Sequence, residues 1–182
     1  KKQRRYLTRK QWGMVLETIE GLPRETIREK AHYHRTRWVF QLLYRSFLRR
    51  FEAASLKMVA TNGEPGFEYL EDGWTIYVVG KGIKEDNIPC PQKLMDEFII
   101  YRRSLGLTPL PSNGEEGYAI QSITGEKKGG ITAQALYKIC EVIFQATAER
   151  VREEFPTDAI NLDKATIHWI RHTGISHFLD KD

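Results

Sequence analysis

Apolar residues recur at helical spacing along several stretches of the chain, and residues typical of turns separate these stretches. Thr8 followed by Gln11 fits a capping box, which predicts that the first helix begins directly after Thr8. A strong amphipathic pattern follows residue 132, and Pro156 is interpreted as the end of that helix. The pattern predicts helices over residues 9–20, 24–47, 50–56, 91–104 and 132–155, and a last helix that begins after Asp163 or Thr166.

The middle of the chain has a different pattern, with short β-prone runs between turn residues. Residues 67–70 and 74–79 are predicted strands joined by a turn that ends in Gly73, and a third strand follows around residues 87–89. Residues 106–130 are rich in Pro and Gly and are predicted to form loops. The predicted fold class is therefore α+β, mostly helical with one small three-stranded antiparallel sheet.

The composition fits one globular domain, because 182 residues with 41% hydrophobic and 29% charged positions can bury a sizeable core. No stretch approaches the ~20 apolar residues that cross a bilayer, so no membrane association is expected. The first ten residues carry charges without a following apolar run, which argues against a secretory signal. Cys90 and Cys140 are too few for a disulfide framework, so a reducing compartment and a cytoplasmic location are expected.

Net charge is only +4, but the basic residues concentrate in the first part of the chain. Residues 1–50 contain 14 Lys and Arg against 4 Glu, whereas residues 51–182 contain 14 Lys and Arg against 20 acidic residues. Such an imbalance is typical of a surface that faces phosphates, and it favours a nucleic-acid partner. The alternative is an ordinary solvated basic face. Residues 1–10 are interpreted as a basic linker arm and residues 11–182 as the folded domain.

The segment with the most specific chemistry lies near the end of the chain, where His168 precedes Arg171 by three residues. Residues three apart on a helix are neighbours, so an imidazole and a guanidinium share one face. The guanidinium is a fork for phosphate oxygens that stays charged, and the imidazole can move a proton beside it. Packing within the helix is the alternative, and for His172 it is the preferred interpretation.

No metal site and no cofactor are predicted. His168 and His172 have the spacing of a zinc-binding helix, but no Glu follows the first His, which excludes the metalloprotease motif. His32 and His34 could bind a metal with one of the two cysteines only if folding happened to bring them together.

Three segments of the chain, taken in order, resemble the catalytic domain of tyrosine recombinases, the phage integrase family. The first is LLYRSFLRRFEAASL, which is similar to the family's Leu-Leu-Tyr-x-Thr-Gly-Leu-Arg-x-x-Glu signature. The resemblance assigns Arg49 as a catalytic phosphate clamp and Glu52 as a supporting acid that orients a nearby basic group. Arg45 and Arg50 are competing assignments and are otherwise expected to contact DNA. The family's Gly is Phe47 here, so a different local geometry is expected.

The second segment, VVGKGIKEDNIP, is similar to the family's β-hairpin Gly-Lys-Gly-x-Lys. The resemblance makes Lys81 the general acid at the hairpin tip and Lys84 a DNA contact, whereas the alternative for each is a solvated turn lysine. The third segment contains the family's His-x-x-Arg box, in which His168 assists proton transfer and Arg171 clamps the phosphate. His172 follows the box, as a His commonly does in the family, and has a supporting role.

The resemblance implies a site-specific DNA recombinase or integrase that cleaves and rejoins strands without metal, through a 3′-phosphotyrosyl intermediate. The family places its Tyr nucleophile some tens of residues after the His-x-x-Arg box, whereas the 8 tyrosines here all precede it. The chain is therefore expected to be a catalytic domain truncated on its C-terminal side and inactive alone. Expected partners are double-stranded DNA and other recombinase protomers in a tetrameric synapse. The alternatives are a catalytically inactive integrase-like DNA-binding module and a helical regulatory domain with accidental motif matches.

Overall fold

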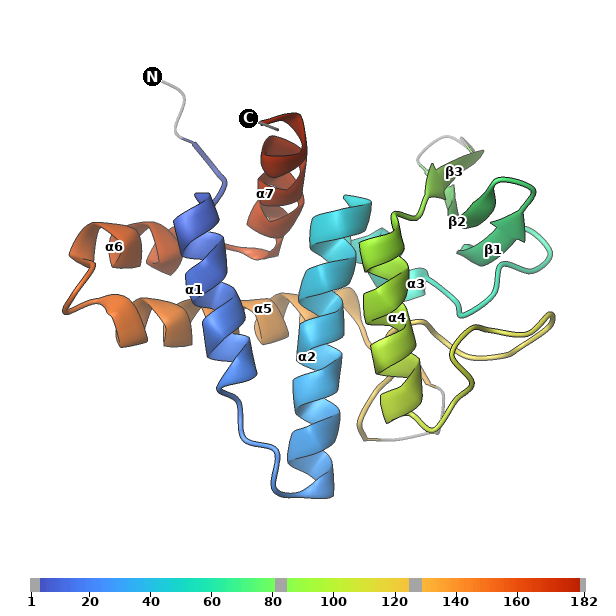
Figure 1. Ribbon diagram of the computed structural model, residues 1–182, viewed down its shortest axis with the longest axis horizontal. Coiled ribbons are helices and arrows are strands. Elements are labelled where there is room, and N and C mark those ends of the chain that lie inside the picture. Colours follow the sequence, from blue (N-terminus) through green and yellow to red (C-terminus); the bar gives the residue numbers. More distant parts are fainter. Residues whose placement is uncertain (1–3, 81–84, 125–128, 181–182) are drawn as a thin grey trace.

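A computed structural model describes residues 4–80, 85–124 and 129–180 of the chain. Helices and a single small sheet form this described part, which confirms the predicted fold class (Figure 1). In chain order the elements are α1 (Arg9–Glu20), α2 (Ile27–Ser46), α3 (Arg50–Ser55), β1 (Gly66–Leu70), β2 (Gly73–Val79), β3 (Glu85–Pro89), α4 (Gln92–Ser104), α5 (Ala133–Val151), α6 (Pro156–Lys164) and α7 (Ile167–Leu179).

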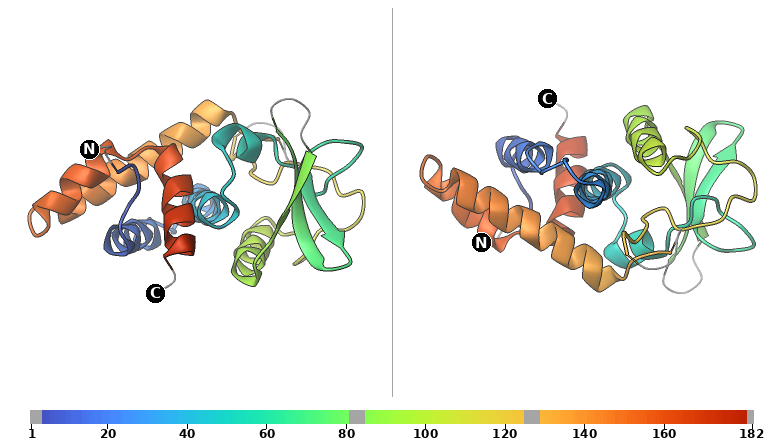
Figure 2. Two further views of the ribbon diagram at one scale, coloured as in Figure 1. Left: turned by 90° about the horizontal axis from the view of Figure 1, so that it is seen from above. Right: turned by 90° about the horizontal axis from the view of Figure 1, so that it is seen from below.

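The elements are spread along one long axis, with the sheet at one end and α6 at the other (Figures 1 and 2). α2 runs through the middle and packs against α1, α4, α5 and α7. The strands pair in the order β1-β2-β3, and both pairs are antiparallel, as predicted. The helical part and the sheet therefore lie side by side, and α2 with α3 forms the connection between them.

The predicted helices form, and side chains in their first turns explain where they begin. The capping box after the arm is present, because the Thr8 hydroxyl accepts from the Gln11 N–H and the Gln11 side chain accepts from the Thr8 N–H. A second box joins Thr26 and Glu29, so α2 begins at Ile27 rather than at residue 24. Each such cap contributes about 1 kcal/mol to helix stability.

The predicted end of the helix after residue 132 is also wrong. α5 ends at Val151, and a separate helix, α6, follows it where no helix is predicted. Pro156 does not stop a helix here but lies in the first turn of α6. The N–H groups of a first turn have no partner within the helix, so the missing N–H of Pro156 costs no hydrogen bond. Of the two candidate caps for α7, Asp163 pairs with Arg152, and Thr166 is the N-cap residue.

Trp38 of α2 joins the sheet, α4 and the long loop in one core. Its side chain is buried, and its Nε1 donates to the Ala119 carbonyl at 2.9 Å. Its ring stacks on Phe98 of α4 with centroids 5.0 Å apart, and Phe98 stacks on Phe67 of β1 at 4.0 Å. Removal of one buried ring of this kind costs about 3–5 kcal/mol, so this stack fixes the sheet to the helices.

A buried guanidinium holds the long loop between α4 and α5. The Arg102 side chain is fully buried and donates to the two Glu115 carboxylate oxygens at 2.5 and 2.8 Å. It also donates to the Thr108 carbonyl at 2.9 Å. One charge thus fixes both ends of the loop segment 108–115. The Pro and Gly content of this segment predicts a loop, but no local sequence pattern predicts the ion pair that anchors it.

No helix in residues 4–80, 85–124 and 129–180 is long and apolar enough to cross a membrane. Within the same residues, no group of three or more His, Cys, Asp and Glu side chains is placed to hold a metal ion. His32 and His34 lie on α2, and the Cys140 thiol is buried in α5.

Candidate functional site

The joint between α2 and α3 places Arg49 at the surface. α2 ends at Phe47, whose φ of 60° and ψ of 23° lie in the left-handed region. Leu48 is buried and fixes the joint, and Arg49 follows with an exposed side chain as the residue that precedes α3. A left-handed backbone costs a residue with a β-carbon about 1–2 kcal/mol. Phe47 thus adopts a backbone conformation that ordinarily favours Gly.

Glu52 acts on the backbone of this same joint. Its Oε1 accepts a hydrogen bond from the Arg49 N–H at 2.8 Å. A carboxylate in this position satisfies one of the free N–H groups at the start of a helix. Glu52 therefore fixes the main chain from which the Arg49 guanidinium extends.

α7 docks on the joint through Arg171. The Arg171 Nε donates to the Phe47 carbonyl at 2.7 Å, across 124 positions of sequence. Gly174, one turn further along α7, packs so closely on the Tyr44 carbonyl group that a β-carbon would not fit. The structure thus brings Arg171 to the segment that carries Arg49. Within the described part of the chain, the other N–H groups of its guanidinium have no hydrogen-bond partner.

Arg49 lines a groove that leads to the β2–β3 hairpin. The groove has a volume of about 240 Å³ and reaches Gly80, the residue before Lys81. Lys81 and Lys84 lie outside the described residues, so their assignments remain predictions. The residues around the groove are Arg49, Phe51, Glu52, Ser55, Pro65, Val78, Val79 and Gly80.

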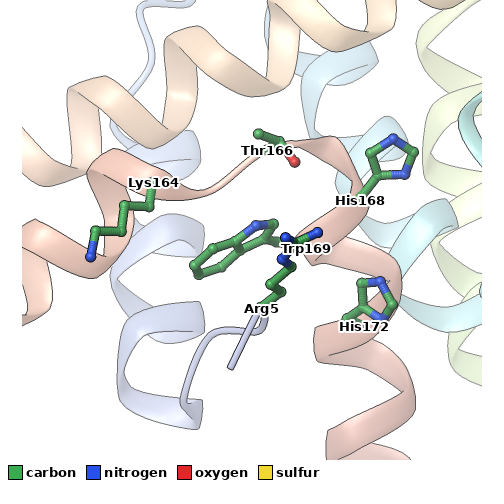
Figure 3. A pocket seen from close by; sticks show the side chains of 6 residues that line it. All are labelled: Arg5, Lys164, Thr166, His168, Trp169 and His172. Carbon is green, nitrogen blue, oxygen red and sulfur yellow. The ribbon is translucent and has the colours of Figure 1, made fainter. Parts of the chain in front are cut away.

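His168 and His172 line a second surface pocket, with a volume of about 600 Å³. Figure 3 shows their rings on successive turns of α7, with the Arg5 side chain of the N-terminal arm between them and the indole of Trp169. The preferred interpretation of His172 as a packed core residue is wrong, because its side chain is exposed to this pocket. Partial desolvation lowers the pKa of His172, and the nearby positive side chains Arg171, His168 and Arg5 lower it further.

The two competing arginines of the first signature lie elsewhere. The Arg45 Nε donates to Gln41 at 2.8 Å, and its side chain lines a third pocket, which Arg49 does not line. The Arg50 guanidinium lies 5.0 Å from the ring centroid of Phe51 and 5.6 Å from that of Tyr137. Of these three arginines, Arg49 is the one that lines the groove reaching Gly80 after the end of β2, and its catalytic assignment stays a prediction.

The N-terminal arm joins the site, which the sequence analysis does not predict. Leu7 is fully buried, its N–H donates to the Thr173 hydroxyl at 2.9 Å, and its carbonyl bonds to His177 Nε2 at 3.0 Å. A carbonyl only accepts, so the His177 proton lies on Nε2, and Nδ1 accepts from the Tyr44 hydroxyl at 2.8 Å. Leu7 interrupts a basic stretch of sequence, but no local pattern indicates that it docks on α7. The docked arm places Arg5 beside His172.

The arrangement gathers guanidinium and imidazole groups on α7 and the α2–α3 joint, a combination suited to binding phosphate oxygens and transferring protons beside them. No protein-family model matches the chain, and no curated protein matches it. Solved structures do resemble it. The XerH site-specific recombinase bound to difH substrate, in a pre-cleavage complex, has a TM-score of 0.58 and 20% identity. That match covers 100% of this chain and 46% of the recombinase.

The post-cleavage complex of XerH with palindromic difH substrate gives a similar result, with a TM-score of 0.57 and 20% identity. It covers 97% of this chain and 42% of the recombinase chain. The chain therefore spans less than half the length of the recombinase that it resembles. Identity this low supports a statement about the fold, and the conclusion is that the chain has the fold of part of a site-specific recombinase.

Proposed function

We propose that this chain is the catalytic domain of a tyrosine-type site-specific DNA recombinase of the phage integrase family. The domain binds double-stranded DNA and holds the scissile phosphate for a Tyr nucleophile that lies outside this chain. Other protomers bind the same DNA and complete a tetrameric synapse. The recombinase-like fold supports the proposal, together with the contact that joins Arg171 to the segment that carries Arg49.

In the proposed reaction the Tyr oxygen forms a bond to phosphorus, the bond from phosphorus to the 5′ oxygen breaks, and a proton goes to that 5′ oxygen. Arg49 and Arg171 bind the non-bridging oxygens as negative charge develops on them. Lys81 donates the proton as general acid, and His168 assists the proton transfer. The two guanidiniums supply the positive charge, so the proposal includes no metal and no cofactor.

The observation that carries the proposal is the hydrogen bond from Arg171 to the Phe47 carbonyl. This contact fixes one guanidinium of the His-x-x-Arg box against the backbone that presents Arg49. Pre-organised charges of this kind stabilise a transition state because the site has no reorganisation to undergo at the moment of reaction. Accidental motif matches in a regulatory helical domain would give no reason for this convergence.

DNA binding by this chain is the first test. The affinity for a generic duplex is measured by fluorescence anisotropy at several salt concentrations. The logarithm of the association constant should fall linearly with the logarithm of salt concentration, with a slope of about −0.9 for each phosphate contact. An affinity that does not respond to salt would rule out the nucleic-acid function.

Strand cleavage is the second test, in a longer protein that contains this chain and the nucleophile. A suicide DNA substrate is incubated with EDTA, and covalent protein–DNA product is read on a denaturing gel. Arg49→Ala and Arg171→Ala should each lower the rate by about 10²–10³-fold, the loss typical of one transition-state contact. Arg28→Ala is the matched control, because Arg28 is an exposed arginine in the first turn of α2, and it should leave the rate within a few-fold of the parent. DNA binding without any covalent product would favour the inactive binding module.

A further inference from the structure

Basic side chains crowd around His172. Arg171, His168 and Arg5 all lower its pKa, and within the described part of the chain no carboxylate acts in the opposite direction. By contrast, Asp180 raises the pKa of His177, the other His of α7 that burial affects. Clustered like charges repel one another and destabilise the folded chain unless an anion neutralises them. The cluster at His172 therefore has the electrostatics of a binding site for an anion.

The pocket beside this cluster is lined by basic side chains as well. Its described lining contains Arg5, Lys164, His168 and His172 and no Asp or Glu. Within the described part of the chain, neither Arg5 nor Lys164 takes part in an ion pair. A volume of about 600 Å³ is ample for a phosphate group with its neighbouring sugar. Figure 3 shows Arg5 reaching toward Trp169 and Lys164 on the opposite side of the indole.

The position of Arg5 depends on the docked arm. Both backbone polar groups of Leu7 are hydrogen-bonded to α7, the N–H to Thr173 and the carbonyl to His177. Arg9 adds two hydrogen bonds to the last turn of the same helix, to the carbonyls of His177 and Asp180 at 2.9 and 2.8 Å. Because Leu7 and Arg9 are both held on α7, the backbone two residues after Arg5 is fixed beside the pocket that Arg5 lines.

We propose that Arg5, with Lys164 and His172, forms a second phosphate site that binds a DNA backbone phosphate next to the scissile one. The inference rests on the proposed function, since it takes duplex DNA as the ligand. Arg5 is then a positioning residue: it binds a non-reacting phosphate and so sets the register of the strand over His168 and Arg171. The arm contributes to the site only while Leu7 is docked on α7.

The test compares three variants of this chain in the anisotropy assay with the generic duplex. Arg5→Ala should remove one phosphate contact and make the salt slope shallower by about 0.9, so between 50 and 200 mM salt its affinity falls about threefold less than that of the parent. Arg4→Ala is the matched control, because Arg4 lies one residue away, is exposed, and does not line the pocket. It should keep the parent slope.

The third variant, Thr173→Val, changes no charge but removes the hydroxyl that accepts from the Leu7 N–H. It should reproduce the shallower slope of Arg5→Ala, with circular dichroism to verify that α7 remains folded. The second phosphate site would be overturned if Arg4→Ala and Arg5→Ala had equal effects, or if Arg5→Ala and Thr173→Val both kept the parent slope. Either result would leave the proposed function intact. A parent chain with no salt-dependent affinity would overturn both.

Discussion

Gly174→Ala tests the close contact between α7 and the end of α2. A β-carbon at position 174 would lie 2.9 Å from the Tyr44 carbonyl carbon and closer still to its oxygen. Contacts between carbon atoms are favourable at about 3.5–4.0 Å, and a backbone group cannot rotate away as a flexible side chain can. Insertion of one methyl group must therefore push α7 away from α2, and the Arg171 hydrogen bond to Phe47 must lengthen.

The magnitude follows from two opposing effects. Replacement of Gly by Ala inside a helix stabilises it by about 0.8–1.0 kcal/mol. Overpacking typically costs about 1–3 kcal/mol, and a clash with main-chain atoms belongs at the upper end of that range. Gly174→Ala should therefore lower the free energy of unfolding by about 2 kcal/mol. For a domain of this size the Tm should fall by roughly 4–8 °C.

Gly13→Ala provides the matched control for this substitution. Gly13 lies within α1, and a β-carbon there would meet nothing within 4 Å. Only the helix effect then remains, so Gly13→Ala should raise the free energy of unfolding by about 0.5–1 kcal/mol. Urea unfolding followed by circular dichroism measures both variants. Equal stabilisation by the two substitutions would refute the contact between Gly174 and Tyr44.

Two further predictions concern stability. Arg102→Ala removes one partner of a buried ion pair and should lower the free energy of unfolding by about 3–5 kcal/mol in urea unfolding, whereas a loss below about 1 kcal/mol would show that the pair does not anchor the loop. Acidification should also destabilise the fold, because desolvation lowers the pKa of four histidines in the native chain. Below the ordinary His pKa of about 6.5, the unfolded chain therefore binds more protons than the native chain, and stability falls with pH. Unfolding free energies measured at pH 7.5 and pH 5.0 should show the loss, and equal values would contradict the lowered pKa values of His32, His34, His172 and His177.

Local signals in the sequence predict most of the elements because their causes are local. The capping box at Thr8 and the turn before Gly73 act over a few residues, and both form as predicted. Pro156 shows the limit of such reasoning, because the same fixed φ that breaks a helix interior also suits a first turn. Which of the two applies depends on the packing of α6 against α5, which no local pattern contains.

The candidate site likewise contains residues that the sequence predicts and residues whose positions it does not predict. Arg49, His168 and Arg171 follow from motif spacing, since each motif lies within a few residues of sequence. The place of Arg5 beside His172 could not be predicted, because it results from hydrogen bonds between Leu7 and α7 that span 166 positions or more. The exposure of His172 could not be predicted either, since it depends on which face of α7 the rest of the fold covers.

The Arg102 anchor has a practical consequence for labelling the protein. Thr108 and Glu115 are bound to one guanidinium, so the six residues between them form a closed surface loop whose ends are already fixed. Extra residues placed within that loop, for example between Asn113 and Gly114, would lengthen it without loosening its base. Each doubling of loop length costs only about 0.6 kcal/mol in closure entropy. A short tag or a fluorophore attachment sequence inserted there would label the protein at a site far along the sequence from both arginines of the proposed clamp.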